Sequence, residues 1–137
     1  MEGPRDEPLG YLLHRVTAAL RAEVTTTVLE PLELAVPEYF CMRMLWQSPK
    51  SNAQLAREAN VSPQAMNKVI RELQDRGLVT RPATVSSGRS LPATLTREGV
   101  ALLKSLDPQV AEAEDRVLAK LSEQDRREFR RLLLAVG

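Results

Sequence analysis

One stretch of the sequence decides the fold: residues 55–70, LAREANVSPQAMNKVI. Its spacing is typical of a helix-turn-helix, with the small residue Ala56 where two helices must cross closely. Asn60 lies at the chain reversal, which needs a left-handed residue; asparagine is the best choice there after glycine. Val61 is expected to pack under the turn, and Ser62 to cap the second helix. The stretch therefore predicts two short helices joined at a tight turn.

Capping residues on either side set the boundaries of these two helices. Ser51 and Gln54 form a capping box that starts the first helix, which is expected to end near Ala59. Ser62 and Pro63 supply an N-cap and a favoured first-turn proline for the second helix, and Gly77 ends it.

Apolar residues at three- and four-residue spacing predict four more helices. Upstream, a long helix runs from Pro8 to Pro31, and another opens at Pro37 and stops before Ser48. Downstream, a helix capped by Thr96 is expected to be kinked or divided at Asp107-Pro108. Ser122 caps the last helix.

The segment between these groups of helices has a different amino-acid composition. Residues 78–81 and 93–96 are β-prone, and residues 82–92 are rich in Ser, Thr, Gly and Pro. This pattern predicts a hairpin with a long tip directly after the helix-turn-helix. The expected fold is mainly α with a small β-hairpin wing, that is, a winged helix-turn-helix.

The near absence of cysteine and histidine reduces the number of function classes that this chain could belong to. Cys41 is the only cysteine and His14 the only histidine, which argues against a disulfide, a metal site and a catalytic triad. We expect no cofactor and no enzymatic activity; a small enzyme using either residue is the remaining rival of that class. The polar N-terminus and the lack of an apolar run of about 18 residues predict a cytoplasmic protein without a membrane partner.

Positive charge is concentrated in the middle of the chain. The net charge is +1, yet residues 62–97 carry six basic and two acidic side chains. A polyanion could be bound there. On the second helix of the motif, the outward face offers side chains suited to base edges and phosphate, from Ser62, Gln64, Ala65, Asn67, Lys68 and Arg71. The competing interpretation is a solvated helical face.

The predicted wing adds a second candidate contact. Arg89 follows Gly88 at the expected tip, where an arginine could enter a narrow minor groove. Any exposed turn can carry such a pair, but its position directly after a helix-turn-helix favours double-stranded DNA as the partner.

The chain resembles the MarR (multiple antibiotic resistance regulator) family from about Leu9 to Val136. The resemblance rests on residues 55–70, on the run from Leu73 through Gly77-Leu78-Val79 to Arg81, and on Gly88-Arg89 followed by Thr94-Leu95-Thr96 and Gly99. It implies a triangular homodimer, with residues 1–34 and 97–137 as the dimerisation region and 35–96 as the DNA-binding region of one structural domain. It also implies that residues 62–76 enter the major groove and Arg89 the minor groove. Ser87 departs from the family, which usually has Asp there to contact the wing arginine.

The resemblance further implies an effector, often a small aromatic acid, bound between the two regions. The candidates for contacting it are His14, Arg15, Tyr39, Met42, Arg43 and Trp46. Arginine could pair with a carboxylate and an aromatic side chain could stack on a ring. Core packing for the aromatic residues, and a surface position for the histidine, are the competing interpretations. Cys41 could be a redox switch, but a buried, inert thiol is favoured.

The terminal helices carry more apolar surface than a small winged helix can cover, which independently favours a two-fold dimer. We therefore expect a ligand-responsive transcription regulator, more consistent with a repressor, that binds a palindromic operator. The rival from another class is a winged-helix module that binds a protein instead of DNA.

Overall fold

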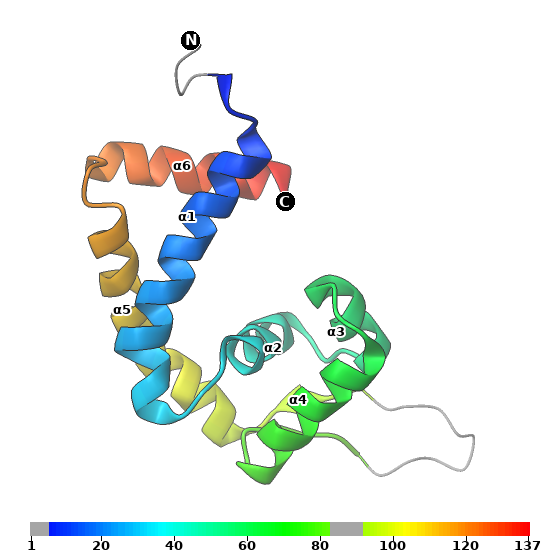
Figure 1. Ribbon diagram of the computed structural model, residues 1–137. Coiled ribbons are helices and arrows are strands. Elements are labelled where there is room, and N and C mark those ends of the chain that lie inside the picture. The colour runs from blue at the N-terminus through cyan, green and yellow to red at the C-terminus, as the bar shows by residue number, and fades with distance from the viewer. Residues whose placement is uncertain (1–5, 83–91) are drawn as a thin grey trace.

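The computed structural model describes residues 6–82 and 92–137, and over these residues the chain is mainly helical with one small sheet (Figure 1). The elements in chain order are α1 (Leu9–Val24), the π-helical turn η2 (Thr25–Leu29), the 3-10 turn η3 (Glu30–Leu32), α2 (Val36–Gln47), α3 (Asn52–Ala59), α4 (Pro63–Asp75), β1 (Val79–Thr80), β2 (Thr94–Leu95), α5 (Arg97–Val117) and α6 (Glu123–Val136). The predicted fold class, mainly α with a small antiparallel hairpin, is confirmed.

The helices form two groups (Figure 1). Helix α1 lies along α5, and α6 lies across them near the chain termini. Helices α2, α3 and α4 pack together with the two-stranded sheet. The core is continuous between the groups, because residues of α5 such as Leu103 and Leu106 are buried in the same cluster as Met42, Leu55 and Ile70.

The first helix changes type before it ends. The prediction placed one helix up to Pro31, whereas the α-helix stops at Val24 and continues as η2 and η3. Pro31 lies inside η3, where the first turn of a helix tolerates proline because its missing N–H needs no partner. The chain reverses at Glu33, which has a left-handed φ of 53°. The wider π turn coincides with the buried side chains of Val28 and Leu29.

Asp107-Pro108 was expected to kink helix α5 or to divide it; α5 runs unbroken through Pro108, so the division is wrong. Proline in a helix interior removes one backbone hydrogen bond and costs about 3 kcal/mol. Here Pro108 lies on the exposed side of the helix, so the carbonyl oxygen that loses its backbone partner can be hydrated. Buried Leu103 and Leu106 before it, and Ala113 after it, hold both halves against the core.

A junction of backbone contacts joins α4, the wing and α5. The Oγ1 of Thr96 donates to the carbonyl oxygen of Gly77 at 2.6 Å and accepts from the N–H of Gly99 at 3.1 Å. The N–H of Thr96 donates to the carbonyl oxygen of Leu78 at 3.1 Å. Position 99 requires glycine, because a Cβ there would overlap the carbonyl oxygen of Leu78. The junction fixes the base of the wing against both helices.

The sheet is shorter than predicted but has an additional neighbour. Val79 pairs with Leu95 and Thr80 with Thr94, while Lys50 and Ala93 form an isolated antiparallel bridge. Lys50 is buried, and its Nζ donates to the carbonyl oxygen of Met44 at 2.8 Å. A lysine at this place satisfies a free carbonyl at the end of α2, and its charge is favourable there. The predicted tip of the wing lies outside the described residues.

Candidate nucleic-acid interface

The turn between α3 and α4 has the geometry that the sequence predicted. Asn60 is left-handed, with φ 56° and ψ 48°, and the N–H of Val61 donates to the carbonyl oxygen of Ala56 at 3.0 Å. The Oγ of Ser62 accepts from the N–H of Ala65 at 3.1 Å, which caps α4. Backbone hydrogen bonds and the left-handed residue thus fix the angle between the two helices.

Two features of this turn differ from expectation or were not foreseen. Val61 does not pack under the turn; its side chain is 42% exposed, at the edge of a cavity between α2 and α4. Its backbone, not its side chain, stabilises the reversal. Asn52 was not singled out from the sequence, yet its Nδ2 donates to the carbonyl oxygen of Pro63 at 3.1 Å. This bond joins the first turn of α3 to the first turn of α4.

The outward face of α4 presents most of the predicted DNA contacts to solvent. The apolar side chains of Met66, Ile70 and Leu73 are buried. The predicted residues that are exposed are Ser62, Gln64, Ala65, Lys68 and Arg71. Asn67 is half-buried, and its Oδ1 accepts from the Nη2 of Arg81 at 3.3 Å. Arg89 lies outside the described residues, as does Ser87.

Arg76, which the sequence did not single out as a site residue, connects α4 with the turn that follows α1, η2 and η3. The Arg76 guanidinium donates to the carbonyl oxygens of Glu33 and Leu32 at 2.7 and 2.8 Å. Bonds from a charged donor are among the stronger hydrogen bonds in proteins. They join the C-terminal end of α4 to the turn that follows η3. The orientation of α4 is therefore tied to that of the first helix.

Two of the six predicted effector contacts line one cavity. Tyr39 and Arg43 lie at a cavity of about 590 Å³ between α1, α2, α5 and α6. Arg43 Nη1 is 3.2 Å from Asp107 Oδ1, so a guanidinium is already held at the wall. Burial raises the pKa of the Tyr39 hydroxyl, partly opposed by the nearby Arg43 charge. The cavity thus offers an aromatic surface, a neutral hydroxyl and a cation.

The other four predicted effector residues lie elsewhere. His14 and Arg15 are exposed on α1, where Arg15 Nη1 is 3.8 Å from Glu7 Oε2. Met42 is fully buried in the core, because it is on the inner face of α2. Trp46 is 44% exposed near the end of α2 and lines none of the three cavities described for this chain. These four residues therefore do not line the cavity beside Tyr39 and Arg43.

Sequence reasoning missed two further arginines at the same cavity. Arg21 of α1 and Arg130 of α6 line it together with Phe40, and Arg130 Nη2 is 3.7 Å from Glu114 Oε1. These residues converge from helices distant in sequence, so no local pattern marks them. Only the three-residue helical spacing between Arg21 and the apolar Val24 hints at an inward position.

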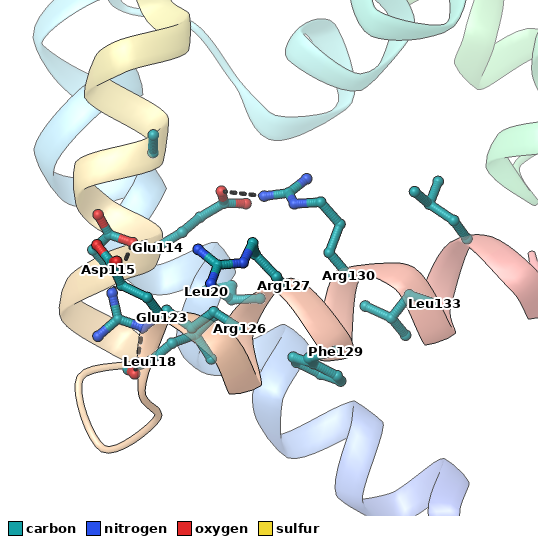
Figure 2. A pocket seen from close by; sticks show the side chains of 12 residues that line it. Leu20, Glu114, Asp115, Leu118, Glu123, Arg126, Arg127, Phe129, Arg130 and Leu133 are labelled. Carbon is teal, nitrogen blue, oxygen red and sulfur yellow. Dashed lines mark hydrogen bonds and ion pairs between the residues drawn. The ribbon is translucent and has the colours of Figure 1, made fainter.

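A second cavity, of about 490 Å³, lies beneath α6 (Figure 2). Arg126 closes one end of it, because its guanidinium donates to the carbonyl oxygens of Leu118 and Leu121 and to Asp115 Oδ1. Phe129 and Leu133 lie on the α6 side of this space (Figure 2). None of the predicted site residues lines it.

Cys41 is buried, and burial raises the pKa of its thiol to about 12. The reactive thiolate is therefore suppressed near neutral pH, in agreement with a structural thiol. Across residues 6–82 and 92–137, no three His, Cys, Asp or Glu side chains gather in a way that could hold a metal ion. Within those ranges, every helix falls short of the length and apolarity needed to cross a membrane.

The fold is that of a winged helix-turn-helix protein. It has a capped helix-turn-helix with a polar outer face, a two-stranded sheet beside it and long terminal helices. Residues 34–91 match the model of the MarR family. The chain is 58% identical to the HTH-type transcriptional repressor Rv2887 of Mycobacterium tuberculosis over 133 residues, which cover 96% of this chain and 95% of the relative. The chain therefore belongs to the MarR family.

Solved structures agree with this assignment. The M. tuberculosis protein Rv2887 in complex with salicylic acid superposes with a TM-score of 0.80 at 58% identity, covering 96% of this chain and 98% of that one. The same protein in complex with DNA gives a TM-score of 0.80 at 53% identity, covering 96% and 99%. Wild-type MarR from E. coli, at 20% identity, shares the fold with a TM-score of 0.81, covering 95% and 97%.

Proposed function

We propose that this MarR family protein is a transcriptional repressor that binds a palindromic DNA operator as a homodimer in the cytoplasm. The observation that carries the proposal is the amphipathic character of α4. Its outer face exposes Gln64, Lys68 and Arg71, and its opposite, apolar face is buried. A relative with 58% identity is named a repressor, and its structure with DNA has the same fold. The protein acts by binding and not by catalysis.

The terminal helices support the two-fold dimer. Among the residues that the structure describes, neither α1 nor α6 has a fully buried side chain. Large apolar side chains are exposed on both, namely Leu9, Tyr11, Leu13, Leu132, Leu133, Leu134 and Val136. Figure 1 shows that α1 and α6 meet at the end of the molecule away from α3 and α4. A second copy that covers this end would leave both copies of α4 free for DNA.

Binding to duplex DNA should depend on the charged residues of α4. We expect Lys68→Ala and Arg71→Ala each to weaken operator binding by about tenfold or more, because each removes a phosphate or guanine contact. Fluorescence anisotropy with a labelled palindromic duplex, selected by the wild-type protein from a random library, measures the effect at several salt concentrations. The slope of log affinity against log salt should become shallower by about one for each lost phosphate contact.

Lys120→Ala is the matched control for these two variants. It removes one exposed positive charge between α5 and α6, far from the helix-turn-helix, and should bind as the wild type does. If all three variants bound alike, or if the wild type enriched no duplex at all, DNA binding through α4 would be wrong. The protein-interaction module would then be the better description.

We infer that the cavity beside Tyr39 and Arg43 binds a small aromatic carboxylate as the effector. Its volume, its phenol and its guanidinium suit an aromatic ring that carries an acid group. Rv2887 has been solved with salicylic acid and with p-aminosalicylic acid. The cavity is lined by both α1 and α2, so a bound ligand could alter the angle between α1 and the DNA-binding region. Such a change would alter the spacing of the two α4 helices in a dimer.

Salicylate provides the test of this site. We expect Arg43→Met to lower salicylate affinity in isothermal titration calorimetry by about tenfold, because it removes the cation that pairs with the carboxylate. It should also reduce the release of operator by salicylate at fixed salt. Lys104→Met removes an exposed cation from nearby α5 and should change neither quantity. Equal salicylate affinity in wild type and Arg43→Met would show that the effector does not bind here.

A further inference from the structure

The hydrogen bond between Arg81 and Asn67 lies at the base of the wing, beside the candidate DNA-reading face. Arg81 directly follows β1, and its Nη2 is 3.3 Å from Oδ1 of Asn67 on α4. Both side chains are half-buried. Asn67 shares its helical face with exposed Gln64 and Arg71, which are three residues before it and four residues after it. The contact therefore involves a residue on the side of α4 that presents polar groups to a partner.

Arginine fixes which way the amide of Asn67 points. A guanidinium has five donors and no acceptor, so only an oxygen can face it. The amide nitrogen must therefore lie on the other side of the Asn67 side chain. Asparagine that is free to turn reads adenine with both groups at once, accepting from N6 and donating to N7. Here Oδ1 already accepts from a charged donor, so its remaining lone pair lies beside a positive charge, while both N–H groups of the amide are free to donate.

We propose that Arg81 turns the amide nitrogen of Asn67 toward DNA as a donor, so that each operator half-site has a keto base, guanine or thymine, at the position that Asn67 contacts. This inference rests on the proposed DNA binding. In the major groove, guanine offers the acceptors O6 and N7 and thymine offers O4, adenine offers the acceptor N7 next to its N6 amino donor, and cytosine offers only the N4 donor. The Arg81 charge beside Oδ1 disfavours the amino group of adenine or cytosine there. Arg81 is thus a positioning residue for base specificity.

A selection experiment tests the base preference directly. Wild-type protein and Arg81→Met are each incubated with a library of random duplexes, bound molecules are sequenced, and affinities are measured for duplexes that differ at one position. The wild type should prefer guanine or thymine at one position of each half-site by about tenfold over cytosine. In Arg81→Met the amide can turn, so adenine should become as good as guanine at that position while the other positions keep their preferences.

Asn67→Asp supplies a second variant that does not depend on removing the arginine. Its carboxylate keeps a partner in Arg81 but can only accept, so the preferred base should change to cytosine or adenine at the same position. Arg57→Met removes an exposed arginine from α3 with the same change of charge, and should leave the base preferences unchanged.

The results separate this inference from the proposed function. If the wild type enriches a palindrome and Arg81→Met retains the same preference at every position, Arg81 does not set the specificity of Asn67. A uniform loss of affinity for all duplexes in Arg81→Met would likewise overturn the inference, because it would mark a phosphate contact. If the wild type enriches no sequence, the proposed function itself fails.

Discussion

Replacing Gly99 by alanine is expected to lower the free energy of unfolding by about 2–3 kcal/mol, the upper part of the range for overpacking a tightly packed site. The added Cβ would overlap the carbonyl oxygen of Leu78 and lie 3.2 Å from both the Leu78 carbonyl carbon and Leu95 Cδ2. Because the obstacle is backbone, the wing and α5 would have to move apart, and the hydrogen bonds of Thr96 at the junction would weaken. Urea denaturation monitored by circular dichroism measures the effect.

Gly10→Ala is the matched control for this substitution. Gly10 lies in the first turn of α1, and a Cβ there meets no atom within 4 Å. Alanine in a helix is favoured over glycine, so this variant should gain about 0.5 kcal/mol. Equal stability of the Gly99→Ala variant and wild type would mean that the wing base and α5 are not packed as described.

Breaking the dimer is expected to have the largest effect on DNA binding. The double variant Leu132→Asp with Leu134→Asp replaces two exposed leucines of α6 by charged side chains, and Leu134 is 74% exposed in the single chain. The protomer should still fold, because these side chains bury little of its own core. Without the second protomer, only one half-site can be bound at a time, which lowers operator affinity by about 100-fold or more.

Sedimentation velocity reports the oligomeric state of this double variant, and anisotropy with the selected duplex reports its affinity. Gln124→Asp adds a charge to the exposed first turn of α6 and should remain dimeric with unchanged affinity. A double variant that is monomeric yet binds the duplex as tightly as the wild type would contradict the role given to the dimer.

Local chemistry made much of the fold predictable. Asn60, Ser62 and the Ser51–Gln54 pair determine their turn and caps through contacts within four residues, and all have the expected geometry. The apolar periodicity likewise placed the helices. The errors fell where packing overrides local preference: Pro108 is accommodated within α5, and the first helix widens into a π turn above buried Val28.

The sites were harder to predict because they join distant residues. Arg76 contacts the carbonyl oxygens of Leu32 and Glu33, more than forty residues away, and nothing in its own neighbourhood indicates this. The Arg81–Asn67 bond links a strand end to a helix. Tyr39 and Arg43, the two anticipated residues that line the proposed effector cavity, lie on one helix. Their partners Arg21 and Arg130 come from the two terminal helices.

In the proposed dimer, two copies of α4 related by two-fold symmetry read DNA together. A hydroxyl-radical footprint of the wild-type protein on its selected duplex shows whether they do. Two equivalent protected segments are expected, one at each of two successive major grooves, with centres about 10 base pairs apart. A single asymmetric segment, or a protection pattern unchanged in a Lys68→Ala and Arg71→Ala double variant, would contradict this arrangement.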